Sequence, residues 1–432
     1  MRRDRLTWTF YGCFVAWGWF LYSFNPSVPL LADELGISDA QAGLHGTAMA
    51  VGAIAASWVT PRLVAREGRR SAVVVGLGLV AAGVLALVLA RSLAVSLPAV
   101  ALLALGGNVA IASSQAGLAQ HHGPAASAAV TEANGVGSSV GLVGPLAAGA
   151  CVAIGWGWRP AVAVTIALTV LTAWGASRLP VGGAMTPPAT PRGRAARVRR
   201  PLAPVGADVP VRGSVEALAP VEPLPDELAD GPGSAHAPAS PTTRRSAGAA
   251  WCFLAAVVAA IALENITTYW STDLVREQTA AGAGIATATT AGFVAGLSGV
   301  RFLVGPLSLR VRPAMLLAAS FVVTVLGWAV LWTASSSTVA VVGLVVAGFG
   351  CGVQYPLSIA LLLSTAPGAQ DAAQARATLA GGLAIGLAPF LLGALADAVG
   401  VHTAFLVLPA VAVVGGAVAL VGGRLVARTP LP

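Results

Sequence analysis

The sequence contains very little charge. Only 10% of its 432 residues are Asp, Glu, Lys or Arg, and Lys is missing altogether, so all 25 basic residues are Arg. Soluble globular domains average about 25% charged residues. Hydrophobic residues make up 56% of the chain, and the mean hydropathy is +0.80. Such a chain lacks the polar groups to cover a surface in water, so we expect it to lie in a lipid bilayer.

Cysteine and the motifs of soluble catalysis are equally scarce. Four cysteines lie in apolar stretches and predict small buried side chains rather than disulfides or metal ligands: Cys13, Cys151, Cys252 and Cys351. Neither a His-Glu-x-x-His motif nor a phosphate-binding Gly-x-x-x-x-Gly-Lys loop is present. The net charge of +8 comes without a basic face interleaved with aromatics. We therefore expect no metal, no cofactor and no nucleic-acid partner.

Long apolar segments predict membrane-spanning helices. A helix needs about 20 apolar residues to cross the hydrocarbon core. Segments of this kind form two sets of six, and the predicted fold class is therefore an all-α polytopic membrane protein with twelve transmembrane helices. The first set is 8–31, 40–64, 71–90, 94–119, 126–154 and 158–179, and the second is 249–274, 281–305, 313–333, 337–364, 370–397 and 402–424.

A fixed offset relates the two sets. Arg66 and Arg310 are 244 positions apart, and so are Pro145 and Pro389. This repetition predicts two pseudo-symmetric six-helix bundles, residues 1–179 and 247–432. Paired bundles of this type are typical of transporters, in which one bundle rocks against the other around a site between them.

The bundles are joined by residues 180–246, which have a different composition. This stretch holds 13 of the 28 prolines, and it has a basic run followed by an acidic one. Without an apolar period it cannot offset its ordering entropy by burial, so we predict a disordered cytoplasmic linker. A folded regulatory insert is the alternative.

Arg placement predicts the orientation. With both termini inside, the outer loops hold only Arg91, Arg159 and Arg276, whereas the inner segments hold the Arg residues of the N-terminus, the linker and the C-terminus. This asymmetry follows the positive-inside rule. We therefore expect a multi-pass protein of the plasma (inner) membrane, with both termini cytoplasmic.

The loop after the second predicted span reads Pro61-Arg62-Leu63-Val64-Ala65-Arg66-Glu67-Gly68-Arg69-Arg70. It resembles the Gly-x-x-x-Asp-Arg-x-Gly-Arg-Arg signature of the major facilitator superfamily, with Pro61 and Ala65 in place of the Gly and the Asp. The resemblance covers the chain outside the linker. It implies transport by alternating access, with a cytoplasmic gate that includes Arg66, Gly68, Arg69 and Arg70. Arg310 occupies the equivalent loop of the second half.

The fifth predicted span carries Gly141-Leu142-Val143-Gly144-Pro145-Leu146-Ala147-Ala148-Gly149. It resembles the Gly-Pro signature of the antiporter, drug-efflux branch of the same family. Gly lets helix backbones approach closely and Pro kinks a helix. The resemblance implies that Gly144, Pro145 and the equivalent Pro389 take part in gating and that the direction is export. Simple helix packing is the alternative.

Glu264 lies near the middle of the seventh predicted span, where an ionisable group is costly and a functional candidate. Thr267, Thr268 and Ser271 continue one polar stripe. Because burial favours the neutral form of a carboxyl, Glu264 is predicted to bind the coupled proton. A structural carboxyl paired with Arg or with backbone is the alternative.

Other charged residues suggest gating roles. Glu132, next to Asn134, and Arg376 occupy equivalent positions in the two halves, and we predict that they meet in the cytoplasmic gate. The alternative is two unrelated charges. Arg301 is interpreted as a side chain that reaches the membrane interface, with anion binding as the other possibility. His45 is interpreted as structural rather than as a proton relay.

The family resemblance implies a cavity lined by helices 1, 4, 7 and 10. Polar or aromatic residues there, several spaced so that they share a helix face, are the predicted substrate-binding set. They suit a partly apolar substrate with few polar groups, although each could serve helix packing instead. The set is Trp19, Tyr22, Asn25, Asn108, Gln115, Asn265, Thr268, Tyr269 and Gln354.

Two other classes of protein are less consistent with the sequence. Gly296-Leu297-Ser298-Gly299 matches a short motif of intramembrane serine proteases, but His402 is the one histidine after Ser298 and is predicted at the outer edge of the last span. A receptor would not need two similar halves. We therefore predict a monomeric, non-enzymatic secondary transporter that couples proton movement to export of a small amphipathic or drug-like compound. Proton-linked uptake of a metabolite or organic anion is the alternative.

Overall fold

The computed structural model describes residues 3–180, 182, 241–308, 311–366 and 370–427. Within these ranges the regular elements are all helices, which confirms the predicted all-α membrane fold. Most of the predicted linker, and with it the prediction of disorder, lies outside the described residues. Its last residues belong to helix α9, which spans Pro241–Thr279.

The first set of helices begins with an interrupted span. The Asp4 carboxylate caps α1 by accepting a hydrogen bond of 3.0 Å from the backbone N–H of Thr7. Gly36, with φ of 61°, ends α2 in the left-handed conformation that glycine adopts readily. The elements are α1 (Arg5–Phe24), η1 (Asn25–Ser27), α2 (Val28–Leu35), α3 (Asp39–Leu89), α4 (Leu93–His122), η2 (Gly123–Ala125), α5 (Ala126–Gly141), α6 (Val143–Ala153) and α7 (Arg159–Ser177).

Helix α3 contains two of the predicted spans. A straight helix of its 51 residues would be about 77 Å long, more than twice the hydrocarbon thickness of about 30 Å. Its backbone leaves the helical conformation at Gly68, where φ is 81° and ψ is 167°. Two helices therefore meet at Gly68, in the loop that the sequence predicted between residues 64 and 71.

The second set follows the same order as the first. It consists of α9, α10 (Ala283–Ser308), α11 (Pro313–Trp332), α12 (Ser337–Ser364), α13 (Gln370–Val399), α14 (Val401–Ala404) and α15 (Val407–Ala427). The 244-residue offset recurs in the helix starts. It relates Asp39 to Ala283, Leu93 to Ser337, and Ala126 to Gln370.

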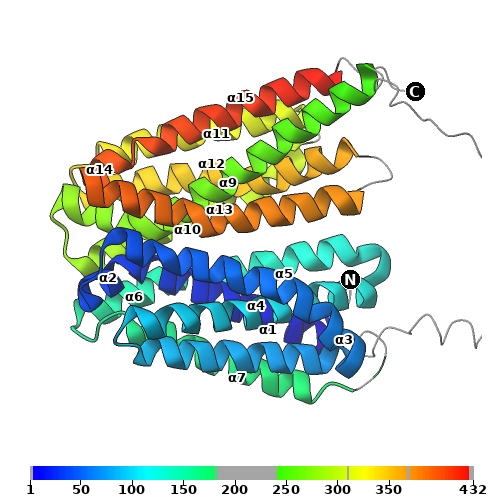
Figure 1. The fold of residues 1–432 in the computed structure, drawn as a ribbon, viewed down its shortest axis with the longest axis horizontal. Helices are drawn as coiled ribbons and strands as arrows, with labels where there is room; N and C mark the ends of the chain where they lie inside the picture. The colour runs from blue at the N-terminus through cyan, green and yellow to red at the C-terminus, as the bar shows by residue number, and fades with distance from the viewer. Residues whose placement is uncertain (1–2, 181, 183–240, 309–310, 367–369, 428–432) are drawn as a thin grey trace, which may run out of the picture. The chain divides into compact units, whose positions relative to one another are not determined.

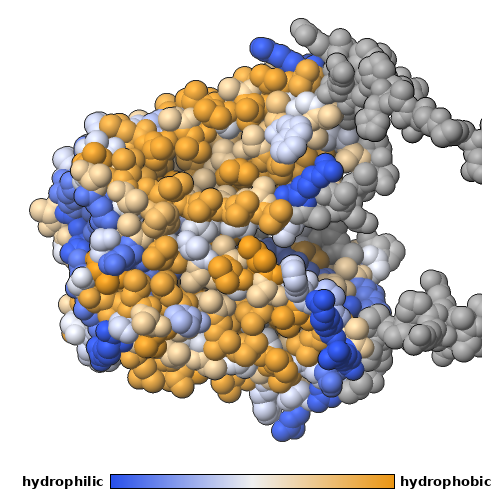
Figure 2. Space-filling model, in the orientation of Figure 1, coloured by the Kyte–Doolittle hydropathy of each residue, from blue (hydrophilic) through white to orange (hydrophobic). Residues whose placement is uncertain are grey.

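The number of spans agrees with the prediction. Ten helices in the described part of the chain are long and apolar enough to cross a membrane. These ten count α3 once although it holds two spans, and they leave out α1, whose 20 residues cover most of the first predicted span, 8–31. Twelve crossings result. Exposed apolar side chains cover the sides of both sets in Figure 2, as expected for surfaces that face lipid.

The helices pack within each set and also across the sets. In the first set α3 packs on α4, and α1 packs on α5 and α7; in the second, α12 packs on α10 and α11. Across the sets, α3 packs on α13 and α6 packs on α10. Both sets thus belong to one compact unit, with the blue-to-cyan helices beside the green-to-red helices in Figure 1.

Candidate functional site

Hydrogen bonds join the two sets at the end of the helices away from the N- and C-termini, which we term the distal end. It includes α2, the starts of α3 and α10, and the ends of α9 and α13. Here α9 contacts η1 and α2 of the first set. Asn25 Nδ2 donates to Thr268 Oγ1 (3.4 Å), Thr272 Oγ1 donates to the carbonyl of Pro26 (2.8 Å), and Arg276 Nη1 donates to Asp33 Oδ2 (2.8 Å).

A carboxylate and a helix N-terminus add to this contact. Asp397 of α13 accepts hydrogen bonds from the backbone N–H groups of Asp39 (2.8 Å) and Ala40 (2.9 Å) at the start of α3. The first N–H groups of a helix have no partner in their own helix and favour negative charge. Asp397 therefore caps a helix of the opposite set.

Glycine allows α3 and α13 to approach each other closely. A Cβ atom on Gly43 would lie 2.6 Å from Phe390 Cα and 2.7 Å from the carbonyl oxygen of Pro389. One turn further, Thr47 Oγ1 donates to the carbonyl of Gly386 (2.6 Å). Pro389, a predicted gating residue, therefore lies in the distal contact between the sets.

The Gly-Pro segment of the fifth predicted span is also at a helix contact. Helix α5 ends at Gly141 and α6 begins at Val143. The helix is therefore interrupted just before the buried residues Gly144 and Pro145. Gly144 packs on α1, where a Cβ would lie 2.9 Å from the backbone nitrogen of Ser23. Gly149 packs on Gly284 of α10 in the other set. A Cβ atom on Gly149 would lie 2.4 Å from the carbonyl oxygen of Gly284.

Glu264 lies half-buried on α9, and within the described residues it has neither a hydrogen bond nor an ion pair. The opposite charge that acts on it belongs to Arg301 of α10. The hydroxyl of Tyr22 on α1 interacts electrostatically with both Glu264 and Arg301. Groups from both sets therefore meet here. A carboxyl without a fixed partner in such a place can bind a proton or a cationic group.

The Arg301 side chain contacts the opposite set. Its Nη1 donates to Ser138 Oγ (3.4 Å), and Ser138 belongs to α5 of the first set. The guanidinium therefore interacts with the charge of Glu264 and with a hydroxyl of the opposite set. Sequence reasoning favoured the interface for this side chain because it could not show which helix lies opposite.

The structure brings part of the predicted binding set together. Asn25 and Thr268 meet across the sets, and the Tyr269 hydroxyl donates to Met49 Sδ of α3 (3.1 Å). Tyr22 lies near Glu264, and Gln115 is half-buried on α4.

Other members of the predicted set have partners within their own bundle. Gln354 Nε2 donates to Thr324 Oγ1 of α11 (2.8 Å), and Trp19 Nε1 donates to the carbonyl of Ala161 (2.9 Å). The side-chain amides of Asn108 and Asn265 donate to carbonyls of their own helices. Helical spacing could not reveal which of these side chains are turned toward neighbours in their own bundle.

The loop signature lies at the proximal end, near the termini. Gly68 forms the bend, Arg66 is exposed, and Arg69 Nη1 donates to Gln120 Oε1 of α4 (2.7 Å). Arg70 donates to the carbonyl of Ser177 at the end of α7. These arginines tie the loop to its own bundle in this structure. Arg310 lies outside the described residues.

The expected pairing of Glu132 with Arg376 is not made. Glu132 instead forms an ion pair with Arg3 of the same bundle, at 2.6 Å between Oε1 and Nε. The neighbouring Asn134 donates to the carbonyl of Val130 in its own helix. Symmetric positions face each other only when the two bundles close at that end, and here the hydrogen bonds between them are concentrated at the distal end.

His45 is buried in the first set with both ring nitrogens engaged. Nδ1 lies 2.7 Å from the carbonyl of Ala42, and Nε2 lies 2.9 Å from Ser96 Oγ. Both partners belong to the same bundle, which agrees with a structural role. In the described part of the chain, no group of three His, Cys, Asp or Glu residues could hold a metal ion.

Several residues of the distal contact were missed by sequence reasoning, above all Asp397. One signal was available for it. An acidic residue near the C-terminal end of a helix is disfavoured by the helix dipole, so its presence requires a partner elsewhere. Thr272 and Thr47 had no such signal, because threonine commonly bonds to its own helix.

Comparisons with known proteins agree with this architecture. The sequence profile of the Major Facilitator Superfamily matches residues 9–270 and 252–430. No functionally curated protein matches the chain. Among solved structures, similar folds include a bacterial homologue of the human lysosomal transporter Spinster in an inward-facing, unoccupied conformation. It has 12% identity, full coverage of both chains and a TM-score of 0.69.

Two further solved structures have a TM-score of 0.72 and 12% identity. One is described as informing substrate recognition in proton-dependent oligopeptide transporters and covers 99% of this chain and 100% of its own. The other is a D-xylose–proton symporter, with 96% of each chain covered. With most of its length matched by the family profile and its twelve spans in two related sets, the chain belongs to the Major Facilitator Superfamily of membrane transporters.

Proposed function

We propose that this transporter exports small amphipathic compounds in exchange for protons, and that Glu264 is the residue that binds the proton. The supporting observation is the placement of Glu264. Glu264 is a carboxyl on a membrane-spanning helix, and among the described residues it has no hydrogen-bond or ion-pair partner. It interacts electrostatically with Arg301 and with Tyr22 of the opposite bundle. Ionisable groups in such positions mark proton pathways in transporters.

A link between the proton and the conformation follows from Arg301. The charged form of Glu264 attracts Arg301, whose guanidinium also donates to Ser138 of the first set. When Glu264 binds a proton, this attraction is lost and Arg301 is released from one of its two interactions. The proton on Glu264 thereby changes the strength of a contact between the bundles, as coupled alternating access requires.

The side chains near Glu264 favour an amphipathic substrate. Tyr22 and Tyr355 offer aromatic surface and hydroxyl groups near the carboxyl. Asn265, the next residue on α9, is half-buried. A cavity with a few polar groups among apolar ones binds compounds that are themselves mostly apolar. Gly144 and Gly149 approach α1 and α10 closely. Together with Pro145 they form the Gly-Pro segment that resembles the antiporter branch, and this resemblance supports export.

Proton-linked uptake of an organic anion is the second candidate. Arg301 is exposed, and a guanidinium binds carboxylates in a bidentate manner. The D-xylose–proton symporter of similar fold moves its substrate together with protons. In that case Arg301 would bind the substrate and Glu264 the proton.

We further propose that the protein is a monomer in the plasma membrane, with both termini in the cytoplasm. The Arg residues at the proximal end support this orientation. The distal contact then faces the outside and is closed. Arg66, Gly68, Arg69, Arg70 and Arg310 would belong to the cytoplasmic gate, which closes when the distal contact opens.

Transport in membrane vesicles of opposite orientation tests the proposal. We expect everted vesicles to accumulate an amphipathic substrate only when their lumen is more acidic than the medium. The Glu264→Gln variant should lose this dependence on the pH gradient. Glu277→Gln is the matched control, since Glu277 lies exposed at the distal end of the same helix. Gradient-driven transport at the wild-type rate by Glu264→Gln would refute the coupling role. Accumulation restricted to right-side-out vesicles would favour uptake.

A further inference from the structure

An apolar groove opens between three helices of the second set. Its volume is about 670 Å³, within the range of pockets that hold small ligands. Nearly all of its lining is apolar. The residues that define it are Trp251, Leu254, Val258 and Ala262 on α9, with Val411 and Val414 on α15, and α13 closes the third side.

The fold itself does not require this groove. The 244-residue offset maps Leu254 onto Phe10 and Val258 onto Phe14 of α1. Both phenylalanines are buried, at 0% and 5% exposure, in a cluster that also contains alanines of α5 and α7. In the first set, large aromatic side chains therefore fill the space between the corresponding helices. The smaller Leu and Val of α9 leave it open.

The groove is about as long as half of the hydrocarbon core is thick. From Trp251 to Ala262 it follows α9 for eleven residues, or about 16 Å. Half of the hydrocarbon core of a bilayer is about 15 Å thick. Because α9 enters the membrane near Ala247 at the proximal end, the groove runs from that interface to about the middle of the bilayer.

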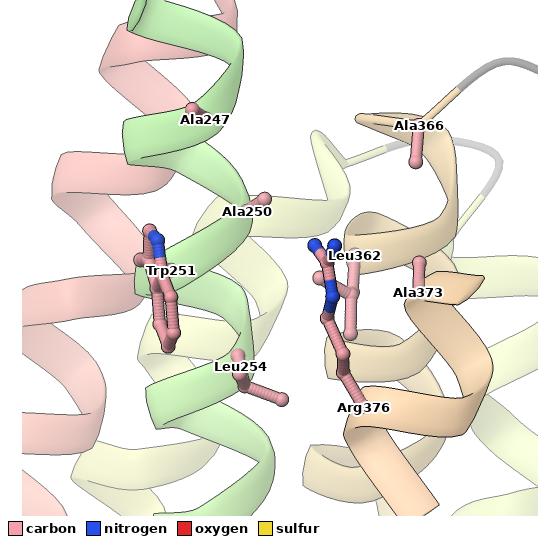
Figure 3. A pocket seen from close by; sticks show the side chains of 8 residues that line it. All are labelled: Ala247, Ala250, Trp251, Leu254, Leu362, Ala366, Ala373 and Arg376. Atoms are coloured by element: carbon pink, nitrogen blue, oxygen red, sulfur yellow. The ribbon is translucent and has the colours of Figure 1, made fainter. Parts of the chain in front are cut away.

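A positive charge lies at the interfacial end. A smaller pocket shares Trp251 and Leu254 with the groove and is lined on its other side by Arg376 of α13. Figure 3 shows the Arg376 side chain reaching from α13 toward α9. Among the described residues Arg376 has no ion-pair partner, since Glu132 is bound to Arg3. A guanidinium at this depth is suited to a phosphate of the bilayer surface.

We propose that this groove is a binding site for an anionic membrane phospholipid, with one acyl chain along α9 and the phosphate on Arg376. The site is separate from the transport cavity, because it is formed entirely by the second bundle. The proposal requires both parts of the ligand. The apolar groove selects the chain, and the arginine selects the negative head group.

Lipid retention by the purified full-length protein tests this. Native mass spectrometry would compare phosphatidylglycerol with phosphatidylcholine of the same chains, each added in detergent. We expect one phosphatidylglycerol to be retained and phosphatidylcholine to be retained about fivefold more weakly, since one cationic side chain acts on the head group. Soluble glycerol phosphate should not compete. Equal retention of the two lipids, or competition by glycerol phosphate, would overturn the proposal.

Two variants separate the chain from the head group. Val258→Phe restores the aromatic residue of the first set and should abolish retention of either lipid. Its control is Val413→Phe, because Val413 is 63% exposed on α15 and outside the groove. Arg376→Gln should remove the preference for phosphatidylglycerol, whereas Arg424→Gln, an exposed arginine of α15, should keep it. Retention unchanged in Val258→Phe would also overturn the proposal. None of these measurements depends on transport.

Discussion

The carboxylate of Asp397, near the C-terminal end of α13, accepts a hydrogen bond of 2.8 Å from the backbone N–H of Asp39, the first residue of α3. The two residues are 358 positions apart in the chain and belong to opposite bundles. In its own helix Asp397 lies at the unfavourable, negative end of the dipole. Its energetic benefit therefore comes from the partner helix, and only while the distal end is closed.

We predict that Asp397→Ala shifts the protein toward a distally open state. Loss of the cap on α3 should change the closed-to-open ratio by about fivefold, because an exposed charge at a helix N-terminus contributes up to about 1 kcal/mol. Distances between spin labels on the distal ends of α2 and α13 would report the shift. Asp33→Asn serves as comparison. Its ion pair with Arg276 is largely exposed, and surface pairs contribute about 0–1 kcal/mol. We expect Asp33→Asn to shift the closed-to-open ratio less than Asp397→Ala does. An equal or larger shift in Asp33→Asn would contradict this expectation.

Gly149→Ala should open the same end by overpacking. The new methyl group would lie 2.4 Å from the carbonyl oxygen of Gly284, so α6 and α10 must separate. Overpacking costs about 1–3 kcal/mol, which corresponds to a shift of roughly five- to 150-fold in the closed-to-open ratio. Gly135→Ala, on α5 with open space around the added methyl, controls for the change in helix propensity. Similar label distances in both variants would exclude a tight contact at Gly149.

His45→Ala should affect stability without affecting proton coupling. The ring is fully buried between the carbonyl of Ala42 and Ser96 Oγ, and unpaired buried groups cost about 1–3 kcal/mol. We expect a lower thermal midpoint in detergent and an unchanged pH profile of the remaining transport. A displaced pH profile with normal stability would instead make His45 a proton carrier.

Asp4→Ala should destabilise the start of α1 in a pH-dependent manner. Burial alone would raise the pKa of Asp4, but hydrogen bonds from Thr7 and the charge of His121 outweigh it and lower this pKa. A carboxyl with a lowered pKa stabilises the folded state above its ordinary pKa, and this contribution disappears as the pH falls through the lowered value. Loss of the cap should cost about 1 kcal/mol at pH 7. The difference in thermal unfolding between the two proteins should shrink as the pH falls below about 4 and vanish once the pH lies below the lowered pKa of Asp4. A difference of the same size at pH 7 and at about pH 3 would rule out the ionised cap.

The sequence was a reliable guide to the helices and their repetition. A bilayer offers no hydrogen-bond partners, so each crossing must be a helix of sufficient apolar length, and hydropathy shows where such helices lie. The 244-residue offset, first seen between Arg66 and Arg310, recurs in the helix starts of the two sets. The bend at Gly68 falls between the predicted spans 40–64 and 71–90, and the break between α5 and α6 lies beside Pro145, where a kink was predicted.

The partners of individual side chains were harder to predict. Glu132 was expected to meet Arg376, yet it binds Arg3 of its own bundle. Gln354 was predicted to line the cavity, but its side chain donates to Thr324 of α11 within the bundle. Periodicity identifies residues on one side of a helix and says nothing of the helix that lies opposite.

Hydropathy, glycine placement and the repeat were thus sufficient to determine the number of crossings and the family-like division into two halves. Only the tertiary structure decided that Asp397 caps α3, that Gly149 meets Gly284, and that Glu264 has no partner among the described residues. The reason is physical. Crossing the membrane is a property of each segment and its solvent, whereas contacts between helices depend on close packing of surfaces that lipid solvates almost equally well.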